Sequence, residues 1–530
     1  MPRASRASSP PSERTVPGLL DEQARRYPER EAIVGPGARY TYAALRDEVR
    51  RVARGLHALG VRRGDKVAIL MGNRCEWIIA DFAITLLGGV MVGVNTWATA
   101  RELEHILSHS DTRFLFCTSK FLRHDYAALL AELKPRLPKL ERIVGVGSNL
   151  PPDWLPFSDL QSLGRNVPES TLDTAQRAVE PKDVAYLLYT SGSTSLPKGV
   201  LLQHYALVEN MWQIGERQRT TERDRLWLAV SLFWGLGCEN ALFNLFTHGG
   251  CIVLQEHFDP GEALELIERE RCTMFYGTPN MAQALHEHPE RARRNLSSLR
   301  GGATIGTPEQ IMRVVELGAR EVCNIYGLTE TYGNCNVTDA RAPLESRLAN
   351  VGPPLAGVEQ RIVDPETGRI LPAGEVGEVR VKGYVTCGYY KDPERTAESF
   401  DEHGFFRTGD LGLLDAEGCL HFRGRLKEMV KTGGINVAPV EVEEVLMSHP
   451  GVKAAFVTGV PDAVHDEILA AVVIPKPGAR VSEKEITEHC RKVLAAYKVP
   501  RLIRFAAETE LPLTTTGKLQ KNRLASTFFR

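Results

Sequence analysis

Short apolar runs alternate with amphipathic helical patterns along much of this chain, and no other feature constrains its fold as strongly. Five apolar residues recur at intervals of four and three positions and predict an amphipathic helix over 41–59, which Gly60 ends. They are Leu45, Val49, Val52, Leu56 and Leu59. Buried strands and further helices are predicted at 66–70, 251–254, 262–270, 274–276, 309–317 and 321–326. Because strands and helices alternate, we expect an α/β fold with a parallel, layered sheet.

The pattern changes near residue 351. Short β segments between Gly and Pro turns, such as 378–383, predict a small β subdomain. After Arg425 the order helix, strand, strand, helix predicts a separate α+β domain of about 100 residues. We therefore expect a large N-terminal domain over 17–426, made of layered α/β subdomains and the small β subdomain, followed by a small C-terminal domain over 427–530.

Charge and cysteine content limit the classes of partner. The 530 residues include 65 basic and 66 acidic side chains, a formal net charge of −1, so no broad field attracts nucleic acid or a membrane surface. The 10 cysteines are scattered without a CxxC pair, which is typical of a reducing compartment and argues against zinc or disulfide frameworks. We expect a cytoplasmic protein.

Two segments could be mistaken for targeting or membrane signals. Residues 1–16 are rich in Ser, Pro and Arg and lack an apolar centre, so we interpret them as a flexible arm, with a transit peptide as the alternative. The apolar stretch 77–94 nearly reaches membrane-spanning length. Asp81 and the Gly88-Gly89 pair favour a buried helix followed by a buried strand instead.

The run TSGSTSLPKG at 190–199 is built like a loop that wraps a polyphosphate. Its glycines let backbone N–H groups approach anionic oxygens, its hydroxyls add donors, and Lys198 adds positive charge. The apolar stretch 184–189 predicts a strand leading into the loop, and α/β proteins bind ligands at such strand ends. A polar linker is the alternative, although linkers rarely lie between two apolar runs. The run is not a Walker loop, because Gly199 and not Ser or Thr follows the lysine.

This run resembles the phosphate loop of the adenylate-forming superfamily, which comprises acyl-CoA synthetases, nonribosomal adenylation domains and luciferases. The resemblance covers about residues 17–525 and includes NIYGLTE at 324–330, FFRTGDLG at 405–412 and PLTTTGKLQK at 512–521, in the family's order. It departs at Ser195, where the family usually has Gly.

The resemblance implies an acyl- or aryl-CoA ligase. Such an enzyme joins a carboxylic acid to coenzyme A through an acyl-adenylate, using ATP and Mg²⁺. Its small C-terminal domain is mobile and rotates between the two steps. The resemblance leaves a homodimer open.

A nucleotide site is implied on the same ground. Tyr326 would stack on adenine, Thr329 would meet the α-phosphate and Glu330 would hold Mg²⁺, which prefers carboxylate and phosphate oxygens. Taken alone, Thr329 and Glu330 could equally cap a helix. The ATP- and AMP-binding residues implied are Thr190, Ser191, Gly192, Ser193, Thr194, Lys198, Gly302, Ala303, Asn324, Tyr326, Gly327, Thr329, Asp410, Phe422 and Arg425, with Thr194 and Glu330 as metal ligands.

Asp410 and Arg425 match family positions that contact ribose. An isolated Asp or Arg is ordinarily a solvated surface charge. Their order and spacing relative to the other motifs favour the ribose contact.

The C-terminal part carries the implied catalytic and coenzyme A residues. Lys518 would bridge the substrate carboxylate and the α-phosphate, acting with Thr329 and Lys198 as the catalytic residues, although TTTGK alone is typical of a plain turn. Lys427 falls at the hinge position, and Gly433 and Gly434 would leave room for the pantetheine arm of coenzyme A.

The acyl pocket is implied around Trp234. The family often has His at this position, and an indole could shorten the pocket or stack on a ring, whereas a core tryptophan is the alternative. Phe233 is not followed by the Asp of amino-acid-activating domains, so an amino acid substrate is not expected. The pocket residues implied are Trp234, Tyr276, Gly277, Met281, Gly301 and Thr331, which do not name the acid.

Three functions stay open. The first is a complete ATP-dependent acid:CoA ligase. The second is a ligase restricted to thioester formation from a supplied acyl-adenylate, because Ser195 could hinder ATP, although Lys518 argues against it. The third is an adenylate-dependent oxygenase or a nucleotide-binding module without catalysis.

Overall fold

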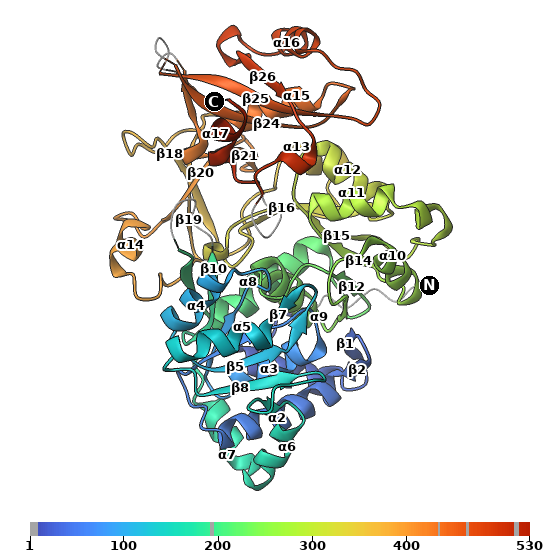
Figure 1. The fold of residues 1–530 in the computed structure, drawn as a ribbon, viewed down its shortest axis with the longest axis vertical. Coiled ribbons are helices and arrows are strands. Elements are labelled where there is room, and N and C mark those ends of the chain that lie inside the picture. Colours follow the sequence, from blue (N-terminus) through green and yellow to red (C-terminus); the bar gives the residue numbers. More distant parts are fainter. Residues whose placement is uncertain (1–8, 191–195, 433–434, 463–465, 514–518, 530) are drawn as a thin grey trace. The chain divides into compact units, whose positions relative to one another are not determined.

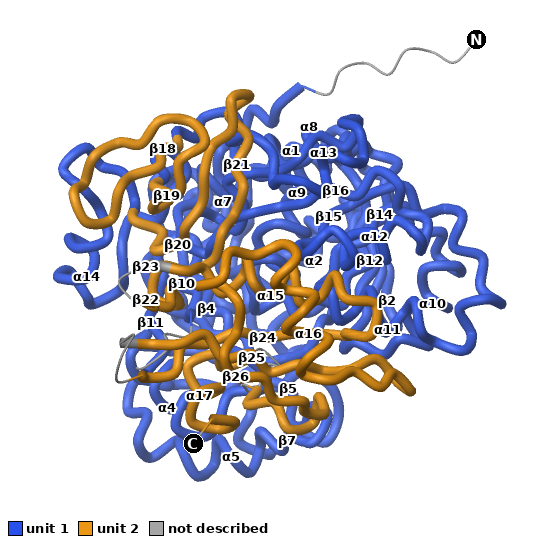
Figure 2. The backbone as a smooth tube through the Cα atoms, turned by 90° about the horizontal axis from the view of Figure 1, so that it is seen from above, with its two compact units in different colours: residues 1–359, 381–406 blue, residues 360–380, 407–530 orange. Residues whose placement is uncertain are grey.

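The computed structural model describes residues 9–190, 196–432, 435–462, 466–513 and 519–529. The chain is a mixed α/β protein with two compact units (Figures 1 and 2). One unit comprises residues 1–359 and 381–406, and the other comprises residues 360–380 and 407–530. The expected α/β fold class, a large N-terminal part followed by a small C-terminal one, is confirmed.

The first unit contains a seven-stranded sheet in the order β11-β10-β4-β3-β5-β8-β9. Its inner strands are parallel, whereas β11 is antiparallel to β10. The strands are β3 (Lys66–Leu70), β4 (Val90–Gly93), β5 (Thr112–Thr118), β8 (Arg142–Val146), β9 (Leu155–Pro156), β10 (Val184–Thr190) and β11 (Lys198–Gln203), and a separate small pair is β6 (Lys120–Phe121) and β7 (His124–Asp125). Between them in sequence lie α3 (Cys75–Leu86), α4 (Ala100–His109), α5 (Tyr126–Leu133), α6 (Asp159–Leu163) and α7 (Glu169–Arg177).

An eight-stranded sheet of the same unit has the order β17-β16-β15-β14-β12-β13-β1-β2. Only its two edge pairs, β1–β2 and β16–β17, are antiparallel. The strands are β1 (Glu31–Gly35), β2 (Ala38–Thr41), β12 (Arg225–Leu228), β13 (Cys251–Leu254), β14 (Met274–Tyr276), β15 (Gly301–Thr304), β16 (Glu321–Tyr326) and β17 (Asn336–Val337). The remaining helices of the unit are α1 (Val16–Arg26), α2 (Tyr42–Ala58), α8 (His204–Gln218), α9 (Leu242–His248), α10 (Pro260–Arg269), α11 (Pro279–Glu287), α12 (Pro308–Glu316), α13 (Leu344–Ala349) and α14 (Pro393–Glu398).

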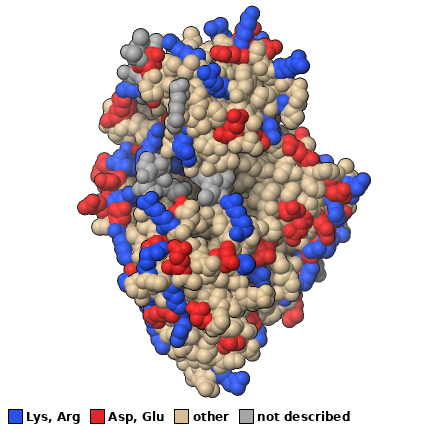
Figure 3. All heavy atoms as spheres, in the orientation of Figure 1, with Lys and Arg blue, Asp and Glu red and all other residues tan. Residues whose placement is uncertain are grey.

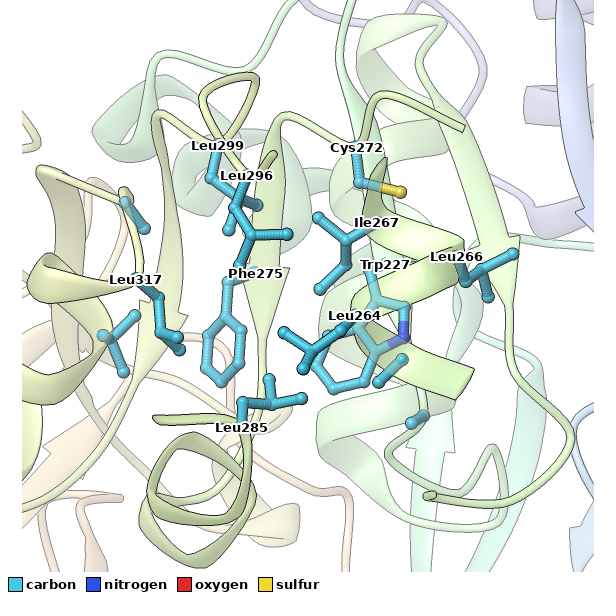
Figure 4. Packing of buried hydrophobic residues seen from close by; sticks show 14 of the residues in the cluster. Trp227, Leu264, Leu266, Ile267, Cys272, Phe275, Leu285, Leu296, Leu299 and Leu317 are labelled. Atoms are coloured by element: carbon cyan, nitrogen blue, oxygen red, sulfur yellow. The ribbon is translucent and has the colours of Figure 1, made fainter. Parts of the chain in front are cut away.

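An apolar core anchors the eight-stranded sheet to its helices. Trp227 on β12 and Phe275 on β14 pack with their rings 5.5 Å apart, and Leu264 and Ile267 of α10 and Leu285 of α11 close over them (Figure 4). All five side chains are fully buried. Burying large side chains in this way stabilises the fold by roughly 1.5–3 kcal/mol each.

The predicted helix over 41–59 is α2, and its apolar spacing explains it. The hydroxyl of Thr41 accepts a hydrogen bond from the N–H of Ala44 and caps the first turn. Four of the five residues that predicted the helix, Leu45, Val49, Val52 and Leu56, face the core.

The stretch 77–94 forms α3 followed by β4, as predicted, and in the described part of the chain no helix is both long and apolar enough to cross a membrane.

The second unit is built on β sheets. A four-stranded sheet has the order β18-β19-β20-β21, and a five-stranded sheet contains β22 to β26. The strands are β18 (Glu359–Val363), β19 (Gly377–Lys382), β20 (Phe406–Leu414), β21 (Leu420–Arg425), β22 (Val430–Thr432), β23 (Ile435–Val437), β24 (Val452–Asp462), β25 (Asp466–Pro475) and β26 (Leu502–Phe505), with helices α15 (Pro439–Met447), α16 (Glu483–Arg491) and α17 (Leu524–Phe528). Residues 407–426 group with the C-terminal part by their contacts, and the functional boundary at 426/427 stays a prediction.

The described part of the predicted arm touches α1. Thr15 caps the helix by accepting from the N–H of Gly18, and Ser12 donates to Glu22. How far the flexible arm extends along residues 1–16 stays a prediction. On the face that Figure 3 shows, basic and acidic side chains are interspersed, in keeping with the balanced charge of the sequence.

Candidate functional site

A partly buried charge cluster joins the two sheets of the first unit. Lys198 Nζ lies 2.7 Å from Glu330 Oε1 and 2.9 Å from the hydroxyl of Tyr389, and that hydroxyl donates to the same carboxylate oxygen at 2.9 Å. The ammonium also lies 4.4 Å from the centre of the Tyr389 ring, a cation–π contact. Burial and the Glu330 carboxylate raise the pKa of Tyr389, so its hydroxyl keeps the proton that it donates.

The antiparallel pair β10–β11 positions Lys198. Thr190, the last residue of β10, is in register with Lys198, the first residue of β11. The hydroxyl of Thr190 is buried, and the described residues offer it no hydrogen-bond partner. An anionic ligand bound beside Lys198 would accept a hydrogen bond from this unpartnered hydroxyl.

Neighbouring parallel strands bring the proposed adenine and acyl residues to one edge of the eight-stranded sheet. Ala303 on β15 pairs with Tyr276 on β14, and Thr304 pairs with Asn324 on β16. Tyr326 ends β16 and is almost fully buried. Because the strands are parallel, their carboxyl ends meet at the same edge, where α/β sheets bind ligands.

Gly302 is required by the backbone of β15. Its φ is +121°, and a Cβ there would lie 2.0 Å from the carbonyl oxygen of Phe275. Gly327, just after β16, is also crowded, since its Cβ would lie 2.3 Å from the carbonyl oxygen of Gly333. Both glycines therefore keep the strand ends close together.

Thr329, Glu330 and Thr331 form a short 3-10 helix, η5 (Thr329–Thr331), after β16. The Thr331 hydroxyl accepts from the N–H of Leu328 and donates to its carbonyl oxygen, and the side chain is fully buried. The hydroxyl of Thr331 is thus used to shape the turn that presents Glu330.

The residues assigned to the acyl pocket differ in their surroundings. Trp234 is partly buried and packs with Phe233 and Trp97, each ring 5.3 Å from the other two. Tyr276 is fully buried, and its hydroxyl accepts from Gln218 and Asn244. These residues are joined by Gly277 after β14, Met281 on α11 and the buried Gly301 on β15. Their contact with an acyl group stays a prediction.

Asp410 and Arg425 lie opposite each other in the second unit. They are paired in register on β20 and β21, and Arg425 Nε lies 3.2 Å from Asp410 Oδ1. Asp410 is buried whereas Arg425 is half exposed. Phe422 lies on β21, and Lys427 lies on the short helix η6 (Leu426–Glu428) that follows it.

Several predicted site residues lie outside the described residues. They are Ser191, Gly192, Ser193, Thr194, Gly433, Gly434 and Lys518, together with the unusual Ser195. Their roles stay predictions.

Comparison with known protein families identifies the chain. The model of the AMP-binding enzyme family matches residues 20–390, and that of the AMP-binding enzyme C-terminal domain matches residues 441–518. The chain belongs to the AMP-binding enzyme family. It is an adenylate-forming enzyme of the acyl-CoA synthetase type.

Relatives of this AMP-binding enzyme match it over nearly its whole length. An acyl-CoA ligase of Aspergillus fumigatus, sidI, is 35% identical over 96% of this chain and 90% of its own. The medium-chain acyl-CoA ligase ACSF2 of Danio rerio is 33% identical over 98% of this chain and 89% of its own. Among solved structures, the anthranilate CoA ligase AuaEII in complex with anthranoyl-AMP has a TM-score of 0.84 at 29% identity and covers 98% of both chains.

The structure also bears on the metal that the family implies. Glu330 offers a buried carboxylate, a hard oxygen donor that suits Mg²⁺. Among the described residues no group of three or more His, Cys, Asp or Glu side chains could hold a metal ion. A carboxylate with phosphate oxygens as the remaining ligands fits Mg²⁺, which takes few protein ligands.

Sequence reasoning missed two residues of this enzyme's site region. Tyr389 is far from the recognised motifs in sequence, and only the paired aromatic residues 389–390 after a β segment could have drawn attention to it.

Glu239 lies fully buried on a π-helix, η3 (Leu236–Ala241), and neither carboxylate oxygen has a hydrogen-bond partner among the described residues. Burial and the nearby Glu330 raise its pKa well above the ordinary range. In the sequence, Glu239 could have been noticed as an acidic residue within the largely apolar stretch 236–246.

Proposed function

We propose that this enzyme is an ATP-dependent carboxylic acid:CoA ligase in which Lys198, Glu330 and Tyr389 form the phosphate side of the adenylation site. The observation that carries the proposal is the contact of Lys198 with Glu330 and Tyr389, because it joins the strand after the phosphate loop to the segment after β16. The named relatives, which are CoA ligases of nearly the same length, support the reaction.

The first half-reaction activates the acid. A carboxylate resists attack because its leaving group would be oxide, so its oxygen attacks the α-phosphorus of ATP and pyrophosphate leaves. Lys198 neutralises charge on the phosphates, and the Thr190 hydroxyl adds a donor beside it. Positioning and charge neutralisation dominate such phosphorus-centred displacements.

Glu330 would hold Mg²⁺ together with Thr194. When bound, the metal neutralises the phosphate oxygens and orients them. In the described structure Glu330 Oε1 accepts from Lys198 and Tyr389, so those two donors hold the carboxylate in place for the cation.

The nucleoside would lie at the edge of the eight-stranded sheet. Tyr326 stacks on adenine, with Asn324, Gly302, Ala303 and Gly327 around the base, and Thr329 meets the α-phosphate. We assign the ribose contact to Asp410 and Arg425, with Phe422 nearby in sequence.

The second half-reaction transfers the acyl group to coenzyme A. We assign Lys518 to adenylation, Lys427 to the hinge, and Gly433 with Gly434 to the passage of the pantetheine arm. The thiolate of coenzyme A attacks the acyl carbon and AMP leaves, so no enzyme thiol takes part.

The acid is proposed to be a non-amino-acid carboxylic acid whose tail meets Trp234 and the largely apolar residues beside it. We further propose that the enzyme works in the cytoplasm, without nucleic acid partners, and that a homodimer is its assembly.

The deciding experiment mixes the enzyme with ATP, Mg²⁺, coenzyme A and a library of carboxylic acids and detects acyl-AMP and acyl-CoA by mass spectrometry. We expect both products for the preferred acid. AMP release without any CoA ester contradicts the proposal, and CoA ester formed only from supplied acyl-adenylate replaces it with the thioester-only function. Oxygen uptake in place of CoA ester would identify an oxygenase.

A further inference from the structure

Two histidines on one helix contact both sides of the phosphate loop. His105 and His109 lie one turn apart on α4, and their rings stack at 5.1 Å with an interplanar angle of 26°. His105 Nε2 lies 2.9 Å from the carbonyl oxygen of Pro197, and since a carbonyl only accepts, this ring nitrogen donates. His109 Nδ1 lies 2.8 Å from the hydroxyl of Tyr189.

These contacts flank the loop. Tyr189 precedes the last residue of β10 and is in register with Gly199, whereas Pro197 directly precedes Lys198 at the start of β11. One histidine therefore holds the strand that enters the loop, and the other holds the chain that leaves it. Neither contact uses a hydroxyl or the lysine of the loop itself.

The surroundings keep the histidine pair in place. The Tyr390 hydroxyl donates to Asp111 at 2.8 Å, and Lys391 donates to the carbonyl oxygen of His109 at 2.9 Å. Both histidines are partly buried and border a cavity of 290 Å³ whose wall includes Lys198. Burial, His105 and Lys391 lower the pKa of His109, so its ring is neutral at neutral pH.

We propose that His105 and His109 are positioning residues for adenylation, which set the spacing of the two strands that carry the phosphate loop. The proposal rests on the proposed function, because it assigns the loop to ATP. The physical reason is preorganisation: when Tyr189 and Pro197 are already held by the scaffold, less freedom is lost as an anion binds between the two strands. His105 matters more, since its partner is the backbone next to Lys198.

The test compares His105→Met, which removes the donor, with His105→Gln, which retains a side-chain N–H at a similar reach. For His105→Met we expect the KM for ATP to rise about fivefold, the effect of one neutral hydrogen bond, with the KM values for acid and coenzyme A unchanged. His105→Gln should return the KM for ATP to within about twofold of the wild type. Ser108→Ala, on the exposed side of the same helix, is the matched control.

Two further measurements distinguish the role of His105 from the function proposed for the enzyme. Thioester formation from synthetic acyl-adenylate should be unaffected in His105→Met, because that step does not use the ATP phosphates. Hydrogen exchange at the amides of Tyr189, Thr190, Lys198 and Gly199 should be faster in His105→Met and unchanged in His105→Gln, whatever the protein's substrate.

An unchanged KM for ATP together with unchanged exchange overturns the proposal, and so does an equal loss of both half-reactions. The wild type could lack adenylation activity while the amides flanking the loop still exchange faster in His105→Met. That result would contradict the proposed function but not the role of His105. Should His105→Met fail to fold, Tyr189→Phe tests the His109 contact by the same measurements.

Discussion

At the scale of single residues, the site depends on one carboxylate oxygen. Oε1 of Glu330 accepts from Lys198 and Tyr389, and Lys198 also rests over the tyrosine ring. Glu330 is buried and Lys198 is partly buried. Removing such charges from water is costly unless further hydrogen bonds complete the pair, and the Tyr389 hydroxyl is that further donor. The sequence motifs indicated Lys198 and Glu330 but not the residue that holds them together.

Tyr389→Phe should slow adenylation about tenfold, because it removes a hydrogen bond to a charged group but keeps the ring beneath Lys198. Acyl-AMP formation in a single turnover measures the effect. Tyr384→Phe is the matched control, since its hydroxyl donates to Glu209, outside this cluster. Equal rates for Tyr389→Phe and wild type would show that Lys198 and Glu330 need no third partner.

At the scale of elements, the strands that carry the site were well predicted because they are short, apolar and bounded by turns. The predicted runs 251–254, 274–276 and 321–326 coincide with β13, β14 and β16. The π-helix at 236–241 was not foreseen, since i to i+5 bonding leaves no periodic signal in a single turn. Strand order was also beyond reach, because pairing of β12 with β14 and of β1 with β13 depends on contacts distant in sequence.

Gly302→Ala should destabilise the enzyme by about 2 kcal/mol or more, because a side chain at positive φ is strained and its Cβ would overlap the carbonyl oxygen of Phe275. Urea unfolding followed by fluorescence gives the free energy. Gly301→Ala is the control on the same strand: its φ is not in the left-handed region, and its nearest Cβ contact would be 3.2 Å. A similar loss for both variants would rule out the backbone explanation.

At the scale of the whole molecule, a buried acid couples stability to pH. Asp81 on α3 is fully buried, accepts from the Tyr186 hydroxyl, and has a pKa raised by burial from 3.8 to about 8. The folded state therefore holds a proton that the unfolded state loses above about pH 4, so this stabilising contribution is full below 3.8 and is lost as the pH rises towards 8.

Unfolding free energy of the wild type should thus fall between pH 6 and 8, by up to about 1.4 kcal/mol per pH unit from this group. Asp81→Asn should flatten that dependence, and Asp47→Asn, at an exposed site on α2, should keep it. Denaturant titrations at a series of pH values measure both. An unchanged slope in Asp81→Asn would mean that other groups titrate instead.

Because adenylation and thioester formation are proposed to use different residues, a single substitution should abolish one half-reaction and spare the other. Lys518→Ala should abolish acyl-AMP formation yet spare thioester formation from synthetic acyl-adenylate, because the lysine is proposed to serve adenylation only. Product analysis of each half-reaction checks it. Equal loss of both steps would contradict the account in which the C-terminal domain presents different residues in turn.

The α/β alternation, the family and the positions of Lys198, Tyr326 and Glu330 could be predicted from the order of residues alone, because periodic burial and short motifs are local properties of the chain. Three contacts became visible only in the folded chain: Tyr389 completes the Lys198–Glu330 pair, and His105 and His109 contact Pro197 and Tyr189. The fold also buries Glu239 with no hydrogen-bond partner among the described residues. These facts depend on which side chains meet from distant segments. Such contacts are set by packing of sheets and helices, and the order of residues along the chain does not encode them in any local pattern.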